Sequence, residues 1–441
     1  MMLCTMPTMH KSSTILKVMH RAASTLVSGG QLMQKKSDDT VITFAKRTAM
    51  GRAKKGQLKD VPVDELLHAL FKATLEKTKL NPSSIDDICV GTDIRAPPLD
   101  CPQVWRHKET KTGKGTCHPP SPLYVSRAAA LAAGIPDSVP ISTVNRLCSS
   151  GLMAIRNIAH SIRAGEISLG VAVGVESMSL NPRPTPAIVE AVSENRRAHN
   201  CIQPMGWTSE MLAQAYNISR QKQDEYALIS HARAAKAVAE GVFSEEILPI
   251  EIRGTVISAD DTVRPNVSAE GLAALKPSFP EWGEASTTAG NASGVGDGAA
   301  LCVVTTRARA EAEGYDVLAK FVGTAIVGVE PRYMGIAPIY AIPKALAQAG
   351  LDMEDIDVYE INEAFASQFA YCVEQLDIPI NKINPNGGSI ALTHPLGMTG
   401  VRQVVTGLEE LRRRNGNLLC TSMCIGSGMG AAGIFVNERR L

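Results

Sequence analysis

The sequence contains one arrangement of helices and strands twice, and this repeat constrains the fold more than any other feature. The connections at Leu80–Val90 and Leu351–Tyr359 each carry a leucine and an isoleucine five positions apart, and each isoleucine is followed by an aspartate. A run with apolar residues at helical spacing precedes each connection. Because strands that alternate with helices indicate a layered fold, we expect an α/β protein with an internal duplication.

The duplication brings two chemically active residues into equivalent positions. In the first half a predicted strand leads to Cys148 and then to a helix, and in the second half a glycine-rich segment leads to His394 and another helix. Ile85 and Cys148 are 63 positions apart, whereas Ile356 and His394 are 38 apart. An insert at about 94–122, a stretch with six prolines, explains the difference. Cys148 and His394 are then expected at helix N-termini that face the junction of two pseudo-symmetric halves.

Cys148 and His394 are candidates for a nucleophile and its base. A free thiol is mostly protonated at neutral pH, and a helix N-terminus with a nearby base increases the fraction of thiolate. Imidazole titrates near neutrality and therefore suits the role of that base. Taken alone, Cys148 is explained as well by a buried core cysteine, and His394 by a histidine that caps a helix.

A second cysteine and an asparagine also stand at informative positions. Cys424 lies two positions before Gly426, in a glycine-rich run that indicates close approach of the backbone to another segment or to a ligand. A turn between core strands is the alternative. Asn362 follows the strand predicted at 357–361, and sites in α/β sheets form at the carboxyl ends of strands. The alternative there is a helix cap.

Four residues near the prolines raise the question of zinc. The spacing of Cys101, His107, Cys117 and His118 is not a usual pattern for a structural zinc site. We therefore expect an exposed loop in this region and no metal.

Composition excludes several classes of protein. The net charge of +1 argues against a broad surface for nucleic acid. No apolar run approaches the roughly 18–20 residues that a membrane span needs, so we expect no integral membrane segment. The ten cysteines fall at irregular spacings, which fits a reducing compartment better than a disulfide scaffold.

The first residues differ from the remainder of the chain. Residues 1–37 carry five basic side chains, no acidic ones and several hydroxyl groups. Such a segment is typical of an organellar transit peptide, and a disordered N-terminus is the alternative. We expect the mitochondrial matrix, with the peroxisome or a related organelle as the alternative.

The four candidate regions together resemble the thiolase family, and the likeness is greatest to the degradative 3-ketoacyl-CoA thiolases of the peroxisomal type. It runs from Val41 to Val436. The motifs that carry it occur in this order: Asn145-Arg146-Leu147-Cys148-Ser149-Ser150-Gly151, Asn362-Glu363-Ala364-Phe365, His394-Pro395-Leu396-Gly397 and Cys424-Ile425-Gly426.

The resemblance implies a five-layer αβαβα fold made of two pseudo-symmetric βαβαβ halves with an inserted loop domain. Under this division, residues 1–38 are a leader for targeting or a disordered segment, and 39–178 are the N-terminal half with its atypical insert. Residues 179–297 are a CoA-binding loop domain, and 298–441 hold the remainder of the core and the C-terminal half.

The resemblance also implies a role for each site residue. Cys148 would take the acyl group after activation by His394, and Cys424 would act as the acid and base. Asn362 would hold a water that forms one oxyanion hole with His394, and the backbone N–H groups of Cys148 and Gly426 would form the other. The residues expected to line the CoA pocket are Met205, Ala289, Ser293, Met334, Ala364 and Phe365.

The activity implied is thiolytic cleavage of 3-ketoacyl-CoA in fatty-acid β-oxidation through an acyl-cysteine. CoA is a substrate, no cofactor or metal is needed, and the resemblance implies a homodimer or homotetramer with no nucleic-acid partner. The alternatives are an acetoacetyl-CoA thiolase and a non-catalytic relative that binds CoA or lipid. The chain departs from the family at Thr393, where glycine is usual, and in the insert at 94–122. A β-branched residue tolerates positive φ poorly, so Thr393 is expected to be strained or to narrow the site.

Overall fold

The structure, a computed structural model, describes residues 32–93, 121–181 and 188–439. Its first half has the predicted alternation of strands and helices. The strands lie in the order β1-β8-β5-β3-β4, in which β3 is parallel to β4 and β5, and β8 is antiparallel to β5 and β1. The elements are β1 Thr40–Arg47, β2 Gly51–Arg52, α3 Val63–Thr78, β3 Asp87–Gly91, α4 Ser121–Ala132, β4 Ile141–Val144, α5 Ser150–Arg163, β5 Leu169–Ser177, β8 Gly296–Thr306 and α11 Arg307–Glu313.

The second half repeats this topology, which confirms the predicted duplication. Its strands lie in the order β9-β12-β11-β10, and a parallel bridge between Tyr359 and Ile383 stands where β4 pairs in the first half. The two connections that revealed the repeat lead into β3 and β10. The elements are β9 Ala319–Gly328, α12 Pro338–Ala349, β10 Val358–Ile361, α13 Ala366–Leu376, α14 Ser389–Leu392, α15 Leu396–Arg414, β11 Leu418–Ile425 and β12 Met429–Asn437.

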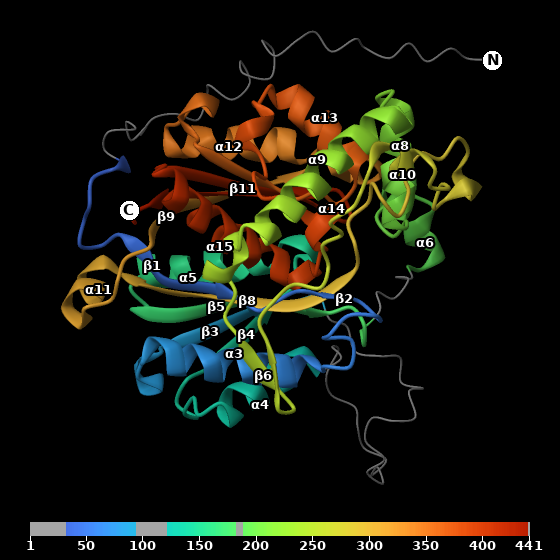
Figure 1. The fold of residues 1–441 in the computed structure, drawn as a ribbon. Helices are drawn as coiled ribbons and strands as arrows, with labels where there is room; N and C mark the ends of the chain where they lie inside the picture. The colour runs from blue at the N-terminus through green and yellow to red at the C-terminus, as the bar shows by residue number, and fades with distance from the viewer. Residues whose placement is uncertain (1–31, 94–120, 182–187, 440–441) are drawn as a thin grey trace.

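The halves stack into five layers, as predicted. Helices α12 and α13 cover one outer face, α3 and α4 cover the other, and α5 and α15 lie between the two groups of strands (Figure 1). The strands are continuous through an antiparallel pairing of β1 with β9 at Val41 and Ile42. Helix α15 is buried on every side from Leu396 to Leu411, because it has strands above and below it.

The helices α8 and α9 of the segment between β5 and β8 pack on the second half, whereas β6 of the same segment packs against α3 of the first half. Helix α9 contacts α13 and α14, and α8 contacts α13 and the 3-10 helix η6, Pro331–Ile336. The segment thus connects the strands of one half to the helices of the other. Its described elements are α6 Glu190–Ser193, α7 Arg196–Asn200, α8 Met205–Ala215, α9 Arg220–Ala239, β6 Ile250–Ile252, β7 Thr255–Ile257 and α10 Ala269–Ala273.

Two predicted regions fall partly or wholly outside the described residues. Of the predicted leader, only residues 32–38 are described, and there Leu32 is buried and Lys35 pairs with Glu438. The predicted insert is described only at its end, where α4 begins, and the four residues of the zinc alternative are not described. Within the described ranges, no helix has both the length and the apolar character to cross a bilayer.

Candidate active site

The close crossing of α5 and α15 brings the N-termini of the two inner helices together. A Cβ atom added at Gly151 would lie 2.5 Å from the carbonyl oxygen of Gly397, and one added at Gly400 would lie 2.3 Å from the backbone nitrogen of Leu152. Only glycine allows the two backbones to approach so closely. Cys148 stands three residues before Gly151, and His394 stands three residues before Gly397. The crossing therefore places both candidate residues at one end of the inner helical layer.

Cys148 lies in a tight turn before α5. The turn is the 3-10 helix η3, Leu147–Ser149, in which Leu147 has φ of +48° and donates its backbone N–H to Asn145 Oδ1 at 2.8 Å. The cysteine itself is 6% exposed. Cys148 thus stands two residues before α5 begins, at the helix N-terminus that the sequence predicted.

His394 is held through both ring nitrogens. Nδ1 lies 2.6 Å from Thr399 Oγ1, and Nε2 lies 3.2 Å from Asn362 Nδ2. The backbone N–H of His394 donates to the carbonyl oxygen of Gly294 at 2.8 Å. The imidazole therefore has a fixed orientation, which a base requires.

Asn362 stands at the carboxyl end of β10, as predicted. Its backbone N–H donates to Ser422 of the neighbouring β11, and its Oδ1 accepts from Ser389 Oγ at 2.6 Å. Since β10 and β11 are parallel and pair Ile361 with Ser422, Asn362 lies close to the end of the strand that carries Cys424.

Cys424 is 1% exposed near the end of β11. Burial raises the pKa of its thiol well above the ordinary value, and the nearby Cys148 raises it further. A thiol that stays protonated at neutral pH can donate a proton. Gly426 is buried just after β11, in the turn whose Ser427 and Gly428 have φ of +65° and +88°.

Most residues predicted to line the CoA pocket gather beside Cys424. Met334 and Ala364 form a buried cluster with Cys424, and Met205 and Phe365 pack against it. Ser293 joins them through its backbone N–H, which donates to the carbonyl oxygen of Ala364 at 3.0 Å. Ala289 is exposed in the segment that leads to Ser293, and its side chain is not part of this cluster.

Thr393 adopts the positive φ that its position requires, with φ of 78° and ψ of 169°. Its side chain packs against the backbone that enters β8: a Cβ at Gly296 would lie 2.3 Å from Thr393 Oγ1, and one at Gly294 would lie 2.9 Å from Thr393 Cγ2. Its buried hydroxyl has no hydrogen-bond partner among the described residues. Thr393 is therefore strained and lies against this backbone segment.

Several polar residues behind the site were not predicted from the sequence. Ser389, Thr399 and Arg402 are buried and connect to Asn362 or His394. Thr399 and Arg402 belong to α15, for which the sequence predicted a helix and no role for its polar residues. The signal that could have found them is the absence of a clearly charged face in the first half of that helix.

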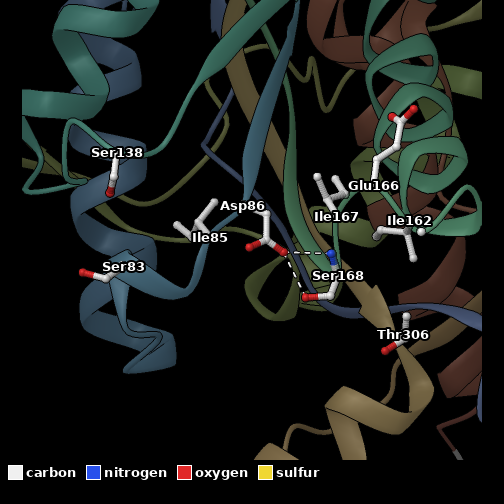
Figure 2. A pocket seen from close by; sticks show the side chains of 10 residues that line it. Ser83, Ile85, Asp86, Ser138, Ile162, Glu166, Ile167, Ser168 and Thr306 are labelled. Atoms are coloured by element: carbon white, nitrogen blue, oxygen red, sulfur yellow. Dashed lines mark hydrogen bonds between the residues drawn. The ribbon is translucent and has the colours of Figure 1, made fainter.

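A concave region with a defined lining lies elsewhere. Its volume is about 670 Å³, and Figure 2 shows Asp86 at its centre, with its carboxylate accepting from the backbone N–H and the hydroxyl of Ser168. Asp86 and Ser168 immediately precede β3 and β5, so this pocket is at the amino ends of the strands. Ligands of α/β sheets bind at the carboxyl ends, and none of the predicted site residues line this pocket.

Comparison with known proteins places this arrangement in a family. The chain matches the family model for the thiolase N-terminal domain over residues 40–101 and 121–308, and the model for the thiolase C-terminal domain over 315–437. Residues 102–120, within the predicted insert, are not matched.

Individual relatives agree with these models. The chain is 47% identical to the peroxisomal 3-ketoacyl-CoA thiolase B of Rattus norvegicus over 413 residues, which cover 91% of this chain and 92% of that protein. The dimeric peroxisomal thiolase of Saccharomyces cerevisiae matches with a TM-score of 0.83 and 42% identity, over 93% of this chain and 100% of that one. Human mitochondrial 3-ketoacyl-CoA thiolase in complex with CoA matches with a TM-score of 0.78 and 34% identity, over 91% and 98%. The chain belongs to the thiolase family.

Proposed function

We propose that the chain is a 3-ketoacyl-CoA thiolase of fatty-acid β-oxidation. The observation that carries the proposal is the convergence, at one end of the inner helical layer, of Cys148, the Asn362–His394 pair and the buried thiol of Cys424. The similarity to the rat and yeast peroxisomal thiolases supports the same function.

The geometry suits cleavage of the C–C bond between the 3-keto carbon and C2, the methylene carbon next to the thioester. His394 takes the proton of Cys148, and the thiolate attacks the 3-keto carbon. Acetyl-CoA leaves as an enolate, a poor leaving group, and Cys424 supplies the proton that this carbon needs. Free CoA then attacks the acyl-cysteine and releases the shortened acyl-CoA. Asn362 with His394, and the backbone N–H groups of Cys148 and Gly426, are the proposed donors to the two oxyanions.

CoA is the proposed second substrate, and we assign its pocket to the surroundings of Cys424. Residues 179–297 are the proposed CoA-binding loop domain, inserted into a first half at 39–178 and followed by 298–441. Met205 begins α8 of this segment and packs against the cluster that contains Ala364 and Cys424. Ser293 lies near the end of the segment, and its backbone N–H donates to the carbonyl oxygen of Ala364. The human relative that binds CoA supports this assignment.

The test is loss of the absorbance of 3-ketoacyl-CoA substrates in the presence of free CoA. We expect the wild-type protein to turn over and Cys148→Ala to lose about 10²-fold or more of kcat, because the nucleophile is gone. Cys302→Ala, which removes a buried thiol from the middle of β8, is the matched control and is expected to keep its rate. A series from acetoacetyl-CoA to long chains separates a broad thiolase from an acetoacetyl-CoA thiolase. Binding of CoA without turnover would favour the non-catalytic alternative.

We propose a homodimer and a peroxisomal location. The yeast relative is dimeric, and light scattering of the purified chain distinguishes a dimer from a tetramer. The rat and yeast relatives are peroxisomal, whereas the mitochondrial human relative is less similar, so the comparisons favour the peroxisome over the predicted mitochondrial matrix. Imaging of the full chain, and of its first 40 residues, fused to a reporter tests the location.

A further inference from the structure

A continuous chain of buried polar groups runs behind the proposed base. Arg402 Nη1 donates to Glu360 Oε2 at 2.9 Å, and Arg402 Nη2 donates to Ser389 Oγ at 3.3 Å. Ser389 Oγ lies 2.6 Å from Asn362 Oδ1. Glu360, Ser389 and Arg402 are at most 2% exposed, so solvent cannot replace a missing partner.

The two ends of this chain fix the direction of every hydrogen bond in it. A guanidinium has no acceptor, so Ser389 Oγ accepts from Arg402, and its own hydrogen is left for Asn362 Oδ1, to which it donates. The oxygen of the Asn362 amide therefore faces Ser389, and its NH₂ group faces His394 Nε2, which must accept. Burial raises the pKa of Glu360 to about 8 even though Arg402 opposes the shift, but Arg402 remains a donor whatever the state of Glu360.

The hydrogen bonds of Thr399, at the other end of this chain of polar groups, indicate the same tautomer of His394 independently. Thr399 Oγ1 lies 2.8 Å from the carbonyl oxygen of Pro395, which can only accept, so the Thr399 hydrogen is used there. Thr399 Oγ1 must then accept from His394 Nδ1 at 2.6 Å. The opposite tautomer of His394 would put two donors against each other at Asn362 and two acceptors at Thr399, and each buried mismatch costs free energy.

We propose that Arg402, Ser389 and Thr399 are positioning residues that hold neutral His394 in the tautomer with hydrogen on Nδ1, so that Nε2 is the acceptor for the proton of Cys148. The inference rests on the proposed thiolase function. In the transfer, the S–H bond of Cys148 breaks, an N–H bond forms at Nε2, and a thiolate and an imidazolium result. Nε2 then becomes a donor beside the Asn362 N–H, and the two can bind a carbonyl oxygen of the substrate together.

The test compares three threonine variants of α15. Thr399→Val keeps the shape of the side chain but removes the acceptor, and Thr399→Ser keeps the hydroxyl. Thr406→Val is the matched control, because Thr406 is buried on the same helix and its hydroxyl has no partner among the described residues. Each variant is measured by kcat and KM, by the pH dependence of the rate of iodoacetamide alkylation at Cys148, and by thermal unfolding. Alkylation of Cys148→Ala gives the background.

We expect Thr399→Val to lose roughly tenfold or more in kcat with KM within about twofold, because the base is misoriented but the pocket is unchanged. Its alkylation rate should fall at neutral pH and approach the wild-type rate at high pH, where the thiolate forms without help. Thr399→Ser should recover most of both losses. The same alkylation test on Ser389→Ala examines the other end of the chain.

Two results would overturn the proposal. One is a Thr399→Val protein with the wild-type kcat and alkylation profile, and the other is equal losses in Thr399→Val and Thr406→Val. Alkylation does not depend on turnover, so it separates the two claims. If wild type fails to cleave 3-ketoacyl-CoA but the variants differ in alkylation as expected, the proposed function fails and the tautomer assignment stands.

Discussion

Single residues around His394 determine how the proposed base is held. One of them, Thr393, has a backbone conformation that costs free energy. Its φ of 78° and ψ of 169° fall in a region that is essentially reserved for glycine, at a cost of about 1–3 kcal/mol for other residues. The unpaired buried hydroxyl adds a further cost. Because the backbone on both sides is fixed by hydrogen bonds from Thr393 to Ser389 and from His394 to Gly294, the residue cannot relax.

Thr393→Gly is therefore expected to increase the free energy of unfolding by about 1 kcal/mol, after the greater unfolded-state entropy of glycine is allowed for. Urea denaturation measures it. Thr421→Gly is the control, since Thr421 is also buried with an unpaired hydroxyl but has an ordinary strand backbone in β11, and it should lose stability. If Thr393→Gly loses as much stability as Thr421→Gly, the backbone of Thr393 is not strained.

Glu176 is a second residue whose state affects the site, because its Oε2 accepts from the backbone N–H groups of Gly397 at 2.9 Å and Asp93 at 3.0 Å. Burial raises its pKa from 4.5 to about 8. The folded state thus holds the proton more tightly than the unfolded state. Its contribution to stability is fully present below the unfolded pKa and is lost as pH rises toward the folded pKa.

We predict that the unfolding free energy of the wild-type protein falls between pH 4.5 and about 8 relative to Glu176→Gln, by at most about 1.4 kcal/mol per pH unit. The amide resembles the protonated carboxyl group and can still accept both backbone hydrogen bonds. Denaturant titrations of both proteins over this pH range measure the difference. Parallel curves for the two proteins would show that Glu176 is already ionised in the fold.

Among the secondary-structure elements, α5 and α15 determine whether the site exists. Their backbones touch at Gly151, Gly397 and Gly400, and Cys148 and His394 each lie two residues before the helix begins. A separation of the helices by one methyl group would move Cys148 away from His394. The same elements explain the burial of the polar groups on α15, which faces strands on both sides.

Gly400→Ala is predicted to lower the unfolding free energy by about 1–3 kcal/mol and to reduce kcat, because the new Cβ would lie 2.3 Å from the backbone nitrogen of Leu152, which cannot move aside alone. For Gly407→Ala on the same helix, the three atoms nearest to the new Cβ all belong to the side chain of Leu419, which can change rotamer, and alanine favours the helix by up to about 1 kcal/mol. Denaturation and kinetics of the two variants should therefore differ, and equal effects would show that the crossing can adapt.

For the whole molecule, the two halves are joined at the ends of the described chain as well as through the sheet. Arg307, 3% exposed, donates to Asp39 just before β1 and to Glu438 just after β12. Burial acts to raise the pKa of Glu438, but Arg307 and Lys35 outweigh it and lower that pKa. The ion pair therefore stabilises the fold above the ordinary pKa of glutamate and loses its effect as pH falls.

Arg307→Met should lower the unfolding free energy by about 2 kcal/mol or more at neutral pH, since it leaves two largely buried carboxylates with only their lysine partners, Lys35 at Glu438 and Lys320 at Asp39. The loss should shrink in acid, where the carboxylates are protonated. Arg309→Met removes a more exposed arginine of the same helix, and we expect a loss below about 1 kcal/mol. Thermal or denaturant unfolding of both variants at neutral and acidic pH measures this. A loss independent of pH would mean that packing of Arg307, and not its charge, stabilises the junction.

Local patterns in the sequence were sufficient to predict the helices and strands named below, the duplication and the chemistry of the candidate residues. The strand at β1, the helix at α3 and the matching connections before β3 and β10 follow from apolar periodicity, which depends only on neighbouring residues. Cys148, Asn362 and His394 stood out because each follows a predicted strand or precedes a helix, and Cys424 stood out because of the glycine-rich run beside it.

The tertiary structure alone decided which polar groups meet. Thr399 and Arg402 lie on a helix whose pattern predicted only its apolar face. Strands of both halves cover this helix, and the burial makes the two side chains partners of His394 and Ser389. Helices α8 and α9, in the segment between β5 and β8, likewise pack on the half from which this segment does not emerge. Periodicity records which residues of an element are apolar, whereas hydrogen-bond direction and contacts between distant segments depend on how those elements stack.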